Sequence, residues 1–254
     1  MELADAYEYA ITNALEANIT RRAAHGLTLL SNIVWIKSID NTSSATEGNT
    51  GPPNPFNLQS ARGVADFDQA LRFTASANYA LPRFQVSNWA KPVVNGWQAN
   101  GIVAVQSGLP LTITSGVDNS LSGVGNDYAN YVPGVSTARP AGTAKIQEWF
   151  NPAAFTKNPT GTFGNVPRNF LHGPGFNYTN LSLTKNIHFT ADSNRYVQLR
   201  LEAFNAFNHA NFANPEDNFN SNTFGTVTAV DHSADPNSDP SPGRVVQIAG
   251  KFYF

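Results

Sequence analysis

The chain has 254 residues, of which 13% are charged, and its formal net charge is −2. The chain has no excess of basic residues that could bind a phosphate backbone, so no nucleic-acid partner is expected. The absence of cysteine excludes disulfides and thiolate metal sites. No apolar run approaches the about 20 residues that a membrane-spanning helix requires, although the charged fraction is well below the roughly one quarter typical of soluble domains.

Seven segments alternate apolar and polar side chains with the two-residue period of a β-strand. The first two flank the dipeptide His25-Gly26, which predicts a tight turn between them. Their lengths suit tilted strands that cross a bilayer. In chain order the predicted strands are 9–21, 27–38, 68–81, 96–106, 178–189, 195–207 and 244–254.

The connections between these segments alternate between short and long. The short ones are 23–26, 82–95 and 190–194, and the long ones are 40–67, 107–177 and 208–243. Transmembrane barrels have short periplasmic turns and long extracellular loops. We therefore expect an all-β fold, an antiparallel transmembrane β-barrel segment, in which the 107–177 connection has little regular structure. Alternation alone also fits an ordinary antiparallel sandwich, but the strand lengths and the loop asymmetry favour the barrel.

The last segment resembles the terminal strand by which outer-membrane barrels are recognised for assembly. Its last residue is aromatic, and apolar residues occupy alternate positions before it, which are Val246, Ile248, Phe252 and Phe254. That signal usually has a glycine where this chain has Ala249. An unpaired strand offers a template for strand addition, so the barrel-assembly machinery is an expected partner.

Several stretches, in order and with familiar spacing, resemble the C-terminal barrel of Oar-like TonB-dependent transporters of the acidobacterial type, which often carry a carboxypeptidase-regulatory-like N-terminal domain. They include Gly96-Trp97-Gln98, Trp149-Phe150-Asn151-Pro152 and Glu202-Ala203-Phe204-Asn205, and they fall within 21–40, 55–68, 96–110, 149–155, 161–175 and 202–212.

The resemblance implies a 22-stranded barrel filled by an N-terminal plug and powered through a TonB box. About seven of its strands would lie in this chain. Residues 1–254 are then expected to be the C-terminal part of the barrel, a fragment without the plug, the remaining strands and a signal peptide, since residues 1–9 have neither a basic nor an apolar region. TonB would be reached through the missing plug.

Side chains on the polar positions of the strands are expected to face a water-filled lumen. These are Arg72, Asn78, Gln98, Asn100, Arg200 and Glu202. Aromatic residues suit the boundary between lipid and water. We predict that Trp35, Tyr79, Trp97 and Phe207 lie at this boundary, and Tyr178 also suits it. Sugar stacking is the alternative role for such rings.

The sequence predicts no catalytic, cofactor-binding or metal-binding residues. The carboxylates Asp231, Asp235 and Asp239 are loosely spaced and lack an EF-hand pattern, so a solvated acidic loop is favoured over a cation site. No HExxH pair, phosphate-binding loop or nucleophile elbow is present. We therefore expect that the protein is not an enzyme.

Three functions remain open from the sequence. The first is energised uptake or export of a small or oligomeric substrate across the outer membrane, with outer-membrane lipid around the barrel. The second is a structural or adhesion barrel without transport, and the third is a soluble carbohydrate-binding β-sandwich. A plug domain encoded upstream would favour transport over adhesion. Extraction from the membrane only with detergent would exclude the soluble β-sandwich.

Overall fold

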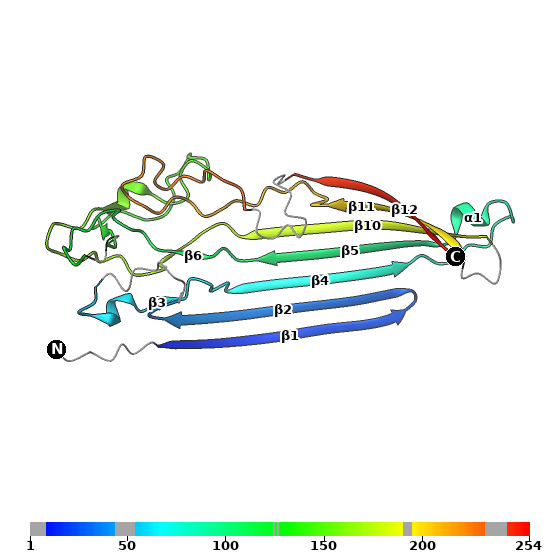
Figure 1. Ribbon diagram of the computed structural model, residues 1–254, viewed down its shortest axis with the longest axis horizontal. Coiled ribbons are helices and arrows are strands. Elements are labelled where there is room, and N and C mark those ends of the chain that lie inside the picture. Colours follow the sequence, from blue (N-terminus) through cyan, green and yellow to red (C-terminus); the bar gives the residue numbers. More distant parts are fainter. Residues whose placement is uncertain (1–8, 44–53, 124, 126, 190–194, 232–242) are drawn as a thin grey trace.

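The computed structural model describes residues 9–43, 54–123, 125, 127–189, 195–231 and 243–254 (Figure 1). Seven long strands dominate it, one in each predicted segment, with ends that differ by a few residues. They are β1 (Ala10–Ala24), β2 (Leu27–Asp40), β4 (Leu71–Ala80), β5 (Trp97–Gln106), β10 (Phe176–His188), β11 (Tyr196–Phe204) and β12 (Val245–Tyr253).

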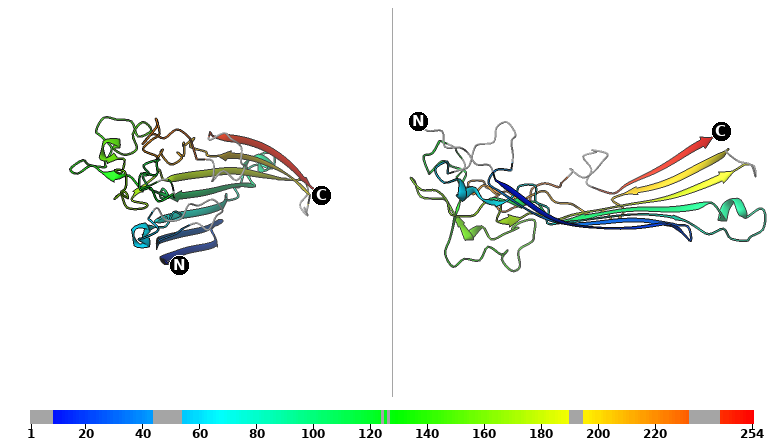
Figure 2. Two further views of the ribbon diagram at one scale, coloured as in Figure 1. Left: turned by 60° about the vertical axis from the view of Figure 1, so that its left-hand side comes forward. Right: turned by 90° about the horizontal axis from the view of Figure 1, so that it is seen from below.

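The long strands form one antiparallel sheet in the order β1-β2-β4-β5-β10-β11-β12, and the short strand β3 (Gly63–Val64) adds to the end of β2. Each long strand therefore pairs with the next long strand along the chain. Within the described residues the sheet is open and curved, with β1 and β12 at its edges (Figure 2). No second sheet of long strands packs on it in this part of the chain, so the soluble β-sandwich is not supported.

The turn between β1 and β2 shows how locally the sequence directs this meander. His25 has φ 53° and Gly26 has φ 80°, and Ala24 pairs with Leu27. Two consecutive positive φ angles in a two-residue loop match the twist of the flanking strands. The predicted tight turn is therefore confirmed. Glycine is required in it, because a Cβ on Gly26 would lie 2.5 Å from the carbonyl oxygen of Ala80.

The connections segregate to opposite ends of the sheet. The β1–β2 turn, the 81–96 connection and the C-terminus lie at one end, whereas the described parts of the long connections lie at the other (Figure 1). The 190–194 connection lies outside the described residues. This segregation agrees with the short-and-long alternation of the sequence.

The register divides the sheet into two chemically different faces, because paired residues project to the same side. The polar face consists mainly of Thr12, Glu16, Asn18, Asn32, Arg72, Thr74, Asn78, Gln98, Asn100, Ser182, Thr184, Gln198, Arg200, Glu202 and Gln247. The apolar face consists mainly of Ile11, Leu15, Ile19, Ile33, Trp35, Phe73, Tyr79, Val103, Leu181, Leu183, Leu199, Leu201, Val246, Ile248 and Phe252.

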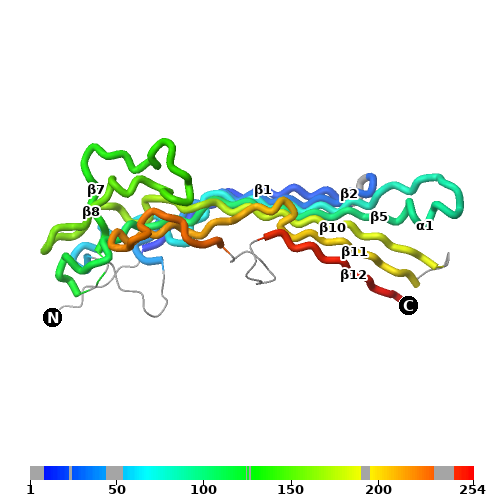
Figure 3. Tube along the Cα trace, turned by 90° about the horizontal axis from the view of Figure 1, so that it is seen from above, coloured from blue at the N-terminus to red at the C-terminus, as the bar shows by residue number. Residues whose placement is uncertain are grey.

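The long connections fold into a compact unit, here called the cap, made of the described residues 54–70, 107–123, 125, 127–175 and 205–231. The cap lies at the end of the sheet opposite to α1 (Lys91–Val94) (Figure 3). Its short elements are η1 (Leu58–Ala61), β6 (Pro110–Leu111), β7 (Asn130–Tyr131), η2 (Pro152–Ala154), β8 (Phe155–Thr156) and β9 (Leu171–His172). Each of these elements is only two to four residues long, so the expectation of little regular structure in 107–177 is confirmed for the described residues.

The cap owes its order to a hydrophobic core of its own. Its buried residues are Leu111, Ile113, Ala129, Phe150, Ala154, Phe155 and Val166. Phe150 meets Phe155 and Phe224 edge to face, with ring centroids 5.5 Å and 5.1 Å apart. Such aromatic pairs add about 0.5–1.5 kcal/mol each beyond the burial of their area. The core thus joins the 107–175 and 205–231 connections, which are far apart in sequence.

No helix in the described part of the chain is long and apolar enough to cross a membrane.

Candidate functional site: the polar face and the cap

One polar row crosses five strands of the sheet. Asn78, Asn100, Ser182, Glu202 and Gln247 are successive partners in the register. The amide of Asn100 donates to the hydroxyl of Ser182 at 3.0 Å. Because strands lie about 4.8 Å apart, such a row presents hydrogen-bonding groups at regular intervals across the sheet.

A second set of polar contacts lies beside this row. Arg200 donates to Gln198 at 3.0 Å and lies 3.5 Å from the carboxylate of Glu202. Gln198 in turn donates to Asn186 at 3.0 Å. Arg200 and Glu202 are both partly exposed, so their ion pair is screened by water and adds little stability.

All six residues predicted to face a lumen thus share the polar face. Three of them carry amides, and the three charged side chains Arg72, Arg200 and Glu202 are spread over β4 and β11. A surface of neutral donors and acceptors with few charges hydrates easily and offers hydrogen bonds to polar solutes.

Near the β1 edge the polar face holds a further hydrogen-bonded cluster. The amide of Asn32 donates to Glu16 at 2.6 Å and to Asn18 at 2.7 Å. A shallow hollow of about 170 Å³ lies beside it, lined in part by Leu30 and Ile102. These two apolar residues break the polar pattern of the face.

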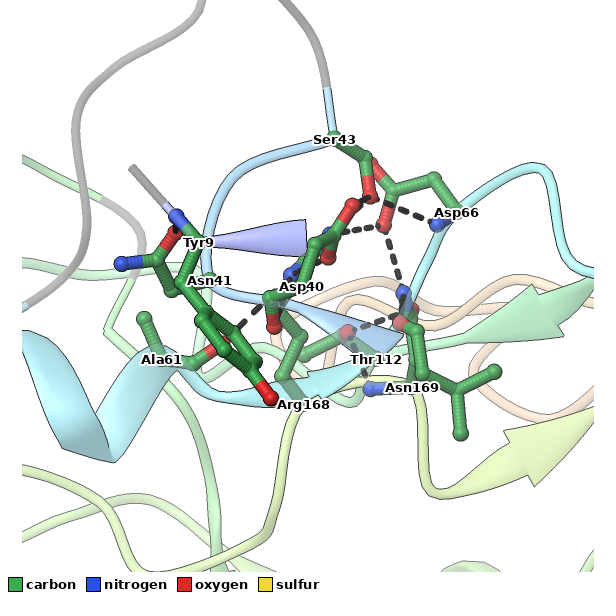
Figure 4. A network of polar contacts seen from close by, with 10 residues as sticks. Tyr9, Asp40, Asn41, Ser43, Ala61, Asp66, Thr112, Arg168 and Asn169 are labelled. Atoms are coloured by element: carbon green, nitrogen blue, oxygen red, sulfur yellow. Dashed lines mark hydrogen bonds and ion pairs between the residues drawn. The ribbon is translucent and has the colours of Figure 1, made fainter. Parts of the chain in front are cut away.

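A buried ion-pair network fastens the cap to the sheet (Figure 4). The guanidinium of Arg168 donates to Asp40 at 2.6 Å and to Asp66 at 2.8 Å. Arg168 is 8% exposed and Asp40 is 2% exposed. The contact joins the end of β2 to two different segments of the cap, so it fixes where the cap sits.

Asn169 extends this network. Its amide donates to the backbone carbonyl of Val64 at 2.6 Å, and its carbonyl accepts from the hydroxyl of Thr112 at 2.9 Å. Its φ of 53° turns the chain sharply next to Arg168, and asparagine tolerates that conformation better than most residues. Nothing in the sequence pattern indicates that Asp40, Asp66, Arg168 and Asn169 meet, because they lie in three separate segments of the chain.

Burial shapes the titration of three groups in the cap. Burial alone would lower the pKa of Arg168, but hydrogen bonds to Asp40 and Asp66 and the charges of these carboxylates outweigh it and raise that pKa. Burial raises the pKa of Tyr128 to about 12. Burial, assisted by the charge of Glu216, also raises the pKa of Asp217 to about 6.

Three of the four predicted interface aromatics lie on the apolar face, near its two ends. Trp35 pairs with Leu71 at the cap end, whereas Tyr79 and Trp97 lie at the opposite end. Phe207 follows β11 and is 74% exposed.

Tyr178 lies on the opposite face from Trp35, Tyr79 and Trp97. It pairs with Ala104 on the polar face and stacks on Phe176, with ring centroids 6.1 Å apart. Its position alternates with that of Thr179, so its side chain shares the side of Asn180 and Ser182. The prediction that groups Tyr178 with the interface aromatics is therefore wrong.

The predicted assembly residues lie on the outermost strand. Val246, Ile248 and Phe252 project from the apolar face of β12, and the ring of Phe252 stacks on that of Phe254 at 6.0 Å. β12 pairs only with β11 within the described residues. Its other edge is available for pairing with a further strand.

The described residues contain no cluster of three or more His, Cys, Asp or Glu side chains that could hold a metal ion. Of the acidic loop considered in the sequence, only Asp231 belongs to the described residues. Asp235 and Asp239 lie outside them, so the expectation for that loop stays a prediction.

A family model described as an outer membrane beta barrel domain matches residues 1–247. No curated protein and no solved structure matches the chain.

Proposed function

The chain belongs to the outer membrane beta barrel domain family, and from this premise we propose that it forms part of the wall and ligand-capturing surface of an energised outer-membrane transporter. The family places the chain in the outer membrane. The finer proposal is a TonB-dependent receptor of the Oar-like kind, in which the seven long strands belong to a 22-stranded barrel.

The observation that carries this proposal is the chemical difference between two faces that, among the described residues, are covered by the rest of the chain only near the ends of the sheet. Leu15, Ile19 and Ile248 on the apolar face are each more than 60% exposed. Such a large apolar surface is costly in water but suits contact with acyl chains. The polar face then turns toward the lumen, where water and solutes meet its amides and hydroxyls.

The two ends of the sheet suit two different compartments. The cap would be extracellular, and the short turns and Phe254 would be periplasmic. Because the cap has a hydrophobic core and a buried ion-pair network, it presents a shaped surface above the lumen. Substrate would bind there and on the polar rows, and a plug moved by TonB would open the way inward. The mechanism needs neither a catalytic group nor a cofactor from this chain.

An adhesion barrel without transport is the competing function, because a folded cap would also suit display at the cell surface. Transport can be tested without knowing the substrate. Compounds taken up from a complex medium are compared by mass spectrometry in the wild type, a strain lacking this gene and a strain lacking TonB. We expect at least one compound to remain in the medium in both mutants. If the gene deletion leaves every TonB-dependent uptake intact and instead reduces surface attachment, the adhesion function is correct.

A further inference from the structure

The connection between β4 and β5, residues 82–95 and here called the elbow, differs from the β1–β2 turn at the same end of the sheet. It is much longer, contains the helical turn α1, and exposes three large apolar side chains. Trp89 is 82% exposed, Val93 is 66% exposed and Phe84 is 49% exposed. A short link between two strands does not need such residues, so their exposure calls for a partner.

The elbow is held against the apolar side of the sheet. The backbone carbonyl of Val93 accepts hydrogen bonds from Trp97 at 2.8 Å and from Lys185 at 3.2 Å. Trp97 and Lys185 are direct partners in the register and both project from the apolar face. Lys185 also donates to the carbonyl of Asn95. The elbow therefore continues the apolar face at its end, rather than covering the polar face.

The elbow is also rigid where it returns to the sheet. The side chain of Asn95 accepts from the backbone amide of Phe84 at 2.7 Å and donates to the carbonyl of Phe84 at 3.0 Å. This pair closes the loop like a backbone bridge. The exposed apolar side chains are thus presented on a closed loop that needs little further ordering to bind.

The charge of the elbow narrows the choice of partner. Its only charged residues are Arg83 and Lys91, and both are exposed. Apolar and aromatic side chains among basic ones, with no acid, are the composition of segments that lie in the headgroup region of anionic membranes. Lysine and arginine can place their stems along apolar surface while their charges stay in water.

We propose that the elbow is a membrane anchor that inserts Phe84, Trp89 and Val93 at the boundary between headgroups and acyl chains, while Arg83 and Lys91 bind anionic phospholipid headgroups. This proposal rests on the assignment of the apolar face to lipid. The elbow lies at the end of the sheet opposite to the cap, and by binding headgroups there it sets how deeply that end of the barrel sits in the membrane.

The absence of cysteine from the sequence allows a direct test by spin labelling. The full chain carrying Val93→Cys is labelled with a nitroxide and reconstituted in vesicles of phosphatidylethanolamine with phosphatidylglycerol, and in vesicles of phosphatidylcholine alone. Relative collision rates with oxygen and with a water-soluble nickel chelate report depth. Leu199→Cys on the apolar face serves as the lipid control, and Ala144→Cys in the cap serves as the water control. The side chain of Val93 is exposed, so its replacement leaves the hydrogen bonds of its carbonyl in place.

In anionic vesicles we expect the ratio of oxygen to nickel collisions at Val93 to be several-fold higher than at Ala144 and lower than at Leu199. Replacing Arg83 and Lys91 by glutamine should shift the ratio toward the water value in anionic vesicles and leave it unchanged in phosphatidylcholine.

Two results would each overturn a part of the proposal, insertion or headgroup binding, while leaving the membrane assignment of the sheet intact. The first is a Val93 label as accessible to nickel as Ala144 while Leu199 lies in lipid. The second is an equal depth in both lipids that the glutamine variants do not change, which would remove the role of anionic headgroups. If Leu199 itself is accessible to water, the proposed lipid-facing sheet is wrong.

Discussion

Arg168 illustrates how one side chain can position a whole unit. It is nearly inaccessible to solvent, and its two arms bind carboxylates from β2 and from the cap. Loss of one partner from a buried ion pair leaves an uncompensated charge, which costs about 3–5 kcal/mol. If Arg168 is removed, water can solvate the carboxylate of Asp66, which is 55% exposed. The lower end of that range therefore applies here.

We predict that Arg168→Met lowers the free energy of unfolding of the cap by about 3 kcal/mol. The measurement is the rate of proteolysis of the cap in the folded, detergent-solubilised protein. Arg139→Met is the matched control, because Arg139 is exposed and donates a hydrogen bond to a backbone carbonyl, that of Thr143, rather than to a carboxylate. Equal protection of both variants would contradict the anchoring role of Arg168.

Asp217 makes the stability of the cap depend on pH. Its pKa is raised to about 6 in the folded state from 3.8, so the folded cap binds a proton before the unfolded chain does. Stability should therefore increase as pH falls from about 7 toward 4, on the order of 1–2 kcal/mol. In Asp217→Asn this dependence should be lost. The measurement is the protease protection of the cap across that pH range. If Asp217→Asn shows the same pH dependence as the wild type, the role of Asp217 is contradicted.

At the scale of the elements, the two-residue turn between β1 and β2 sets the register of the first hairpin. A one-residue slip would exchange its polar and apolar sides. We predict that Gly26→Ala costs at least about 1–2 kcal/mol, because alanine is strained at positive φ and its Cβ would meet the carbonyl of Ala80. Gly161→Ala is the control, since Gly161 also has positive φ but no atom lies within 4 Å of the added Cβ. Thermal unfolding in detergent should rank Gly26→Ala below Gly161→Ala, and equal midpoints would show that the close approach is unimportant.

The terminal strand carries a separate prediction. If β12 is the segment recognised during assembly, Phe254→Ala should reduce the folded protein in the outer membrane several-fold, with little change in the amount synthesised. Heat-modifiable gel migration separates the folded from the unfolded form. Phe56→Ala, which removes an 88% exposed ring in the cap, should leave the folded fraction unchanged. An equal effect of both variants would remove the special role of Phe254.

The strands could be predicted from sequence because two different surroundings, one on each face, impose the same two-residue period. Leu199 and Leu201 alternate with Arg200 and Glu202, and the register places each pair on one face. Tyr178 shows that a residue's position in the alternation is a better guide to its face than its aromatic character. Its parity with Asn180 and Ser182 already indicated the polar face.

The cap could not be predicted in the same way. Its core joins Ile113, Phe150 and Phe224, which lie in no periodic pattern and meet only after the connections have folded together. The Arg168 network likewise depends on long-range contacts, since Asp40 lies 128 positions earlier in the chain. Glycines and asparagines with positive φ turn the chain repeatedly between these contacts. Composition identifies such stretches as loops but gives no signal of which residues will meet.

At the scale of the whole molecule, a curved sheet carries a folded cap at one end and short turns at the other. Its two edges remain unpaired within the described residues, and its faces differ in polarity along every long strand. The same architecture accounts for the outer-membrane location, the aromatic residues near the ends of the apolar face and the anchoring of the cap. The first two depend on lipid contacting one face and water the other.

Cysteine scanning of β11 in intact cells tests that claim most directly. Single cysteines at Leu199, Arg200, Leu201 and Glu202 are exposed to a small, water-soluble maleimide, and the extent of labelling is measured by mass spectrometry. Because neighbouring residues of a strand face opposite sides, positions 200 and 202 should react readily, and positions 199 and 201 should be protected until detergent is added. Uniform reactivity along the strand, or protection of positions 200 and 202 instead, would contradict the assignment of the polar face to the lumen and the apolar face to lipid.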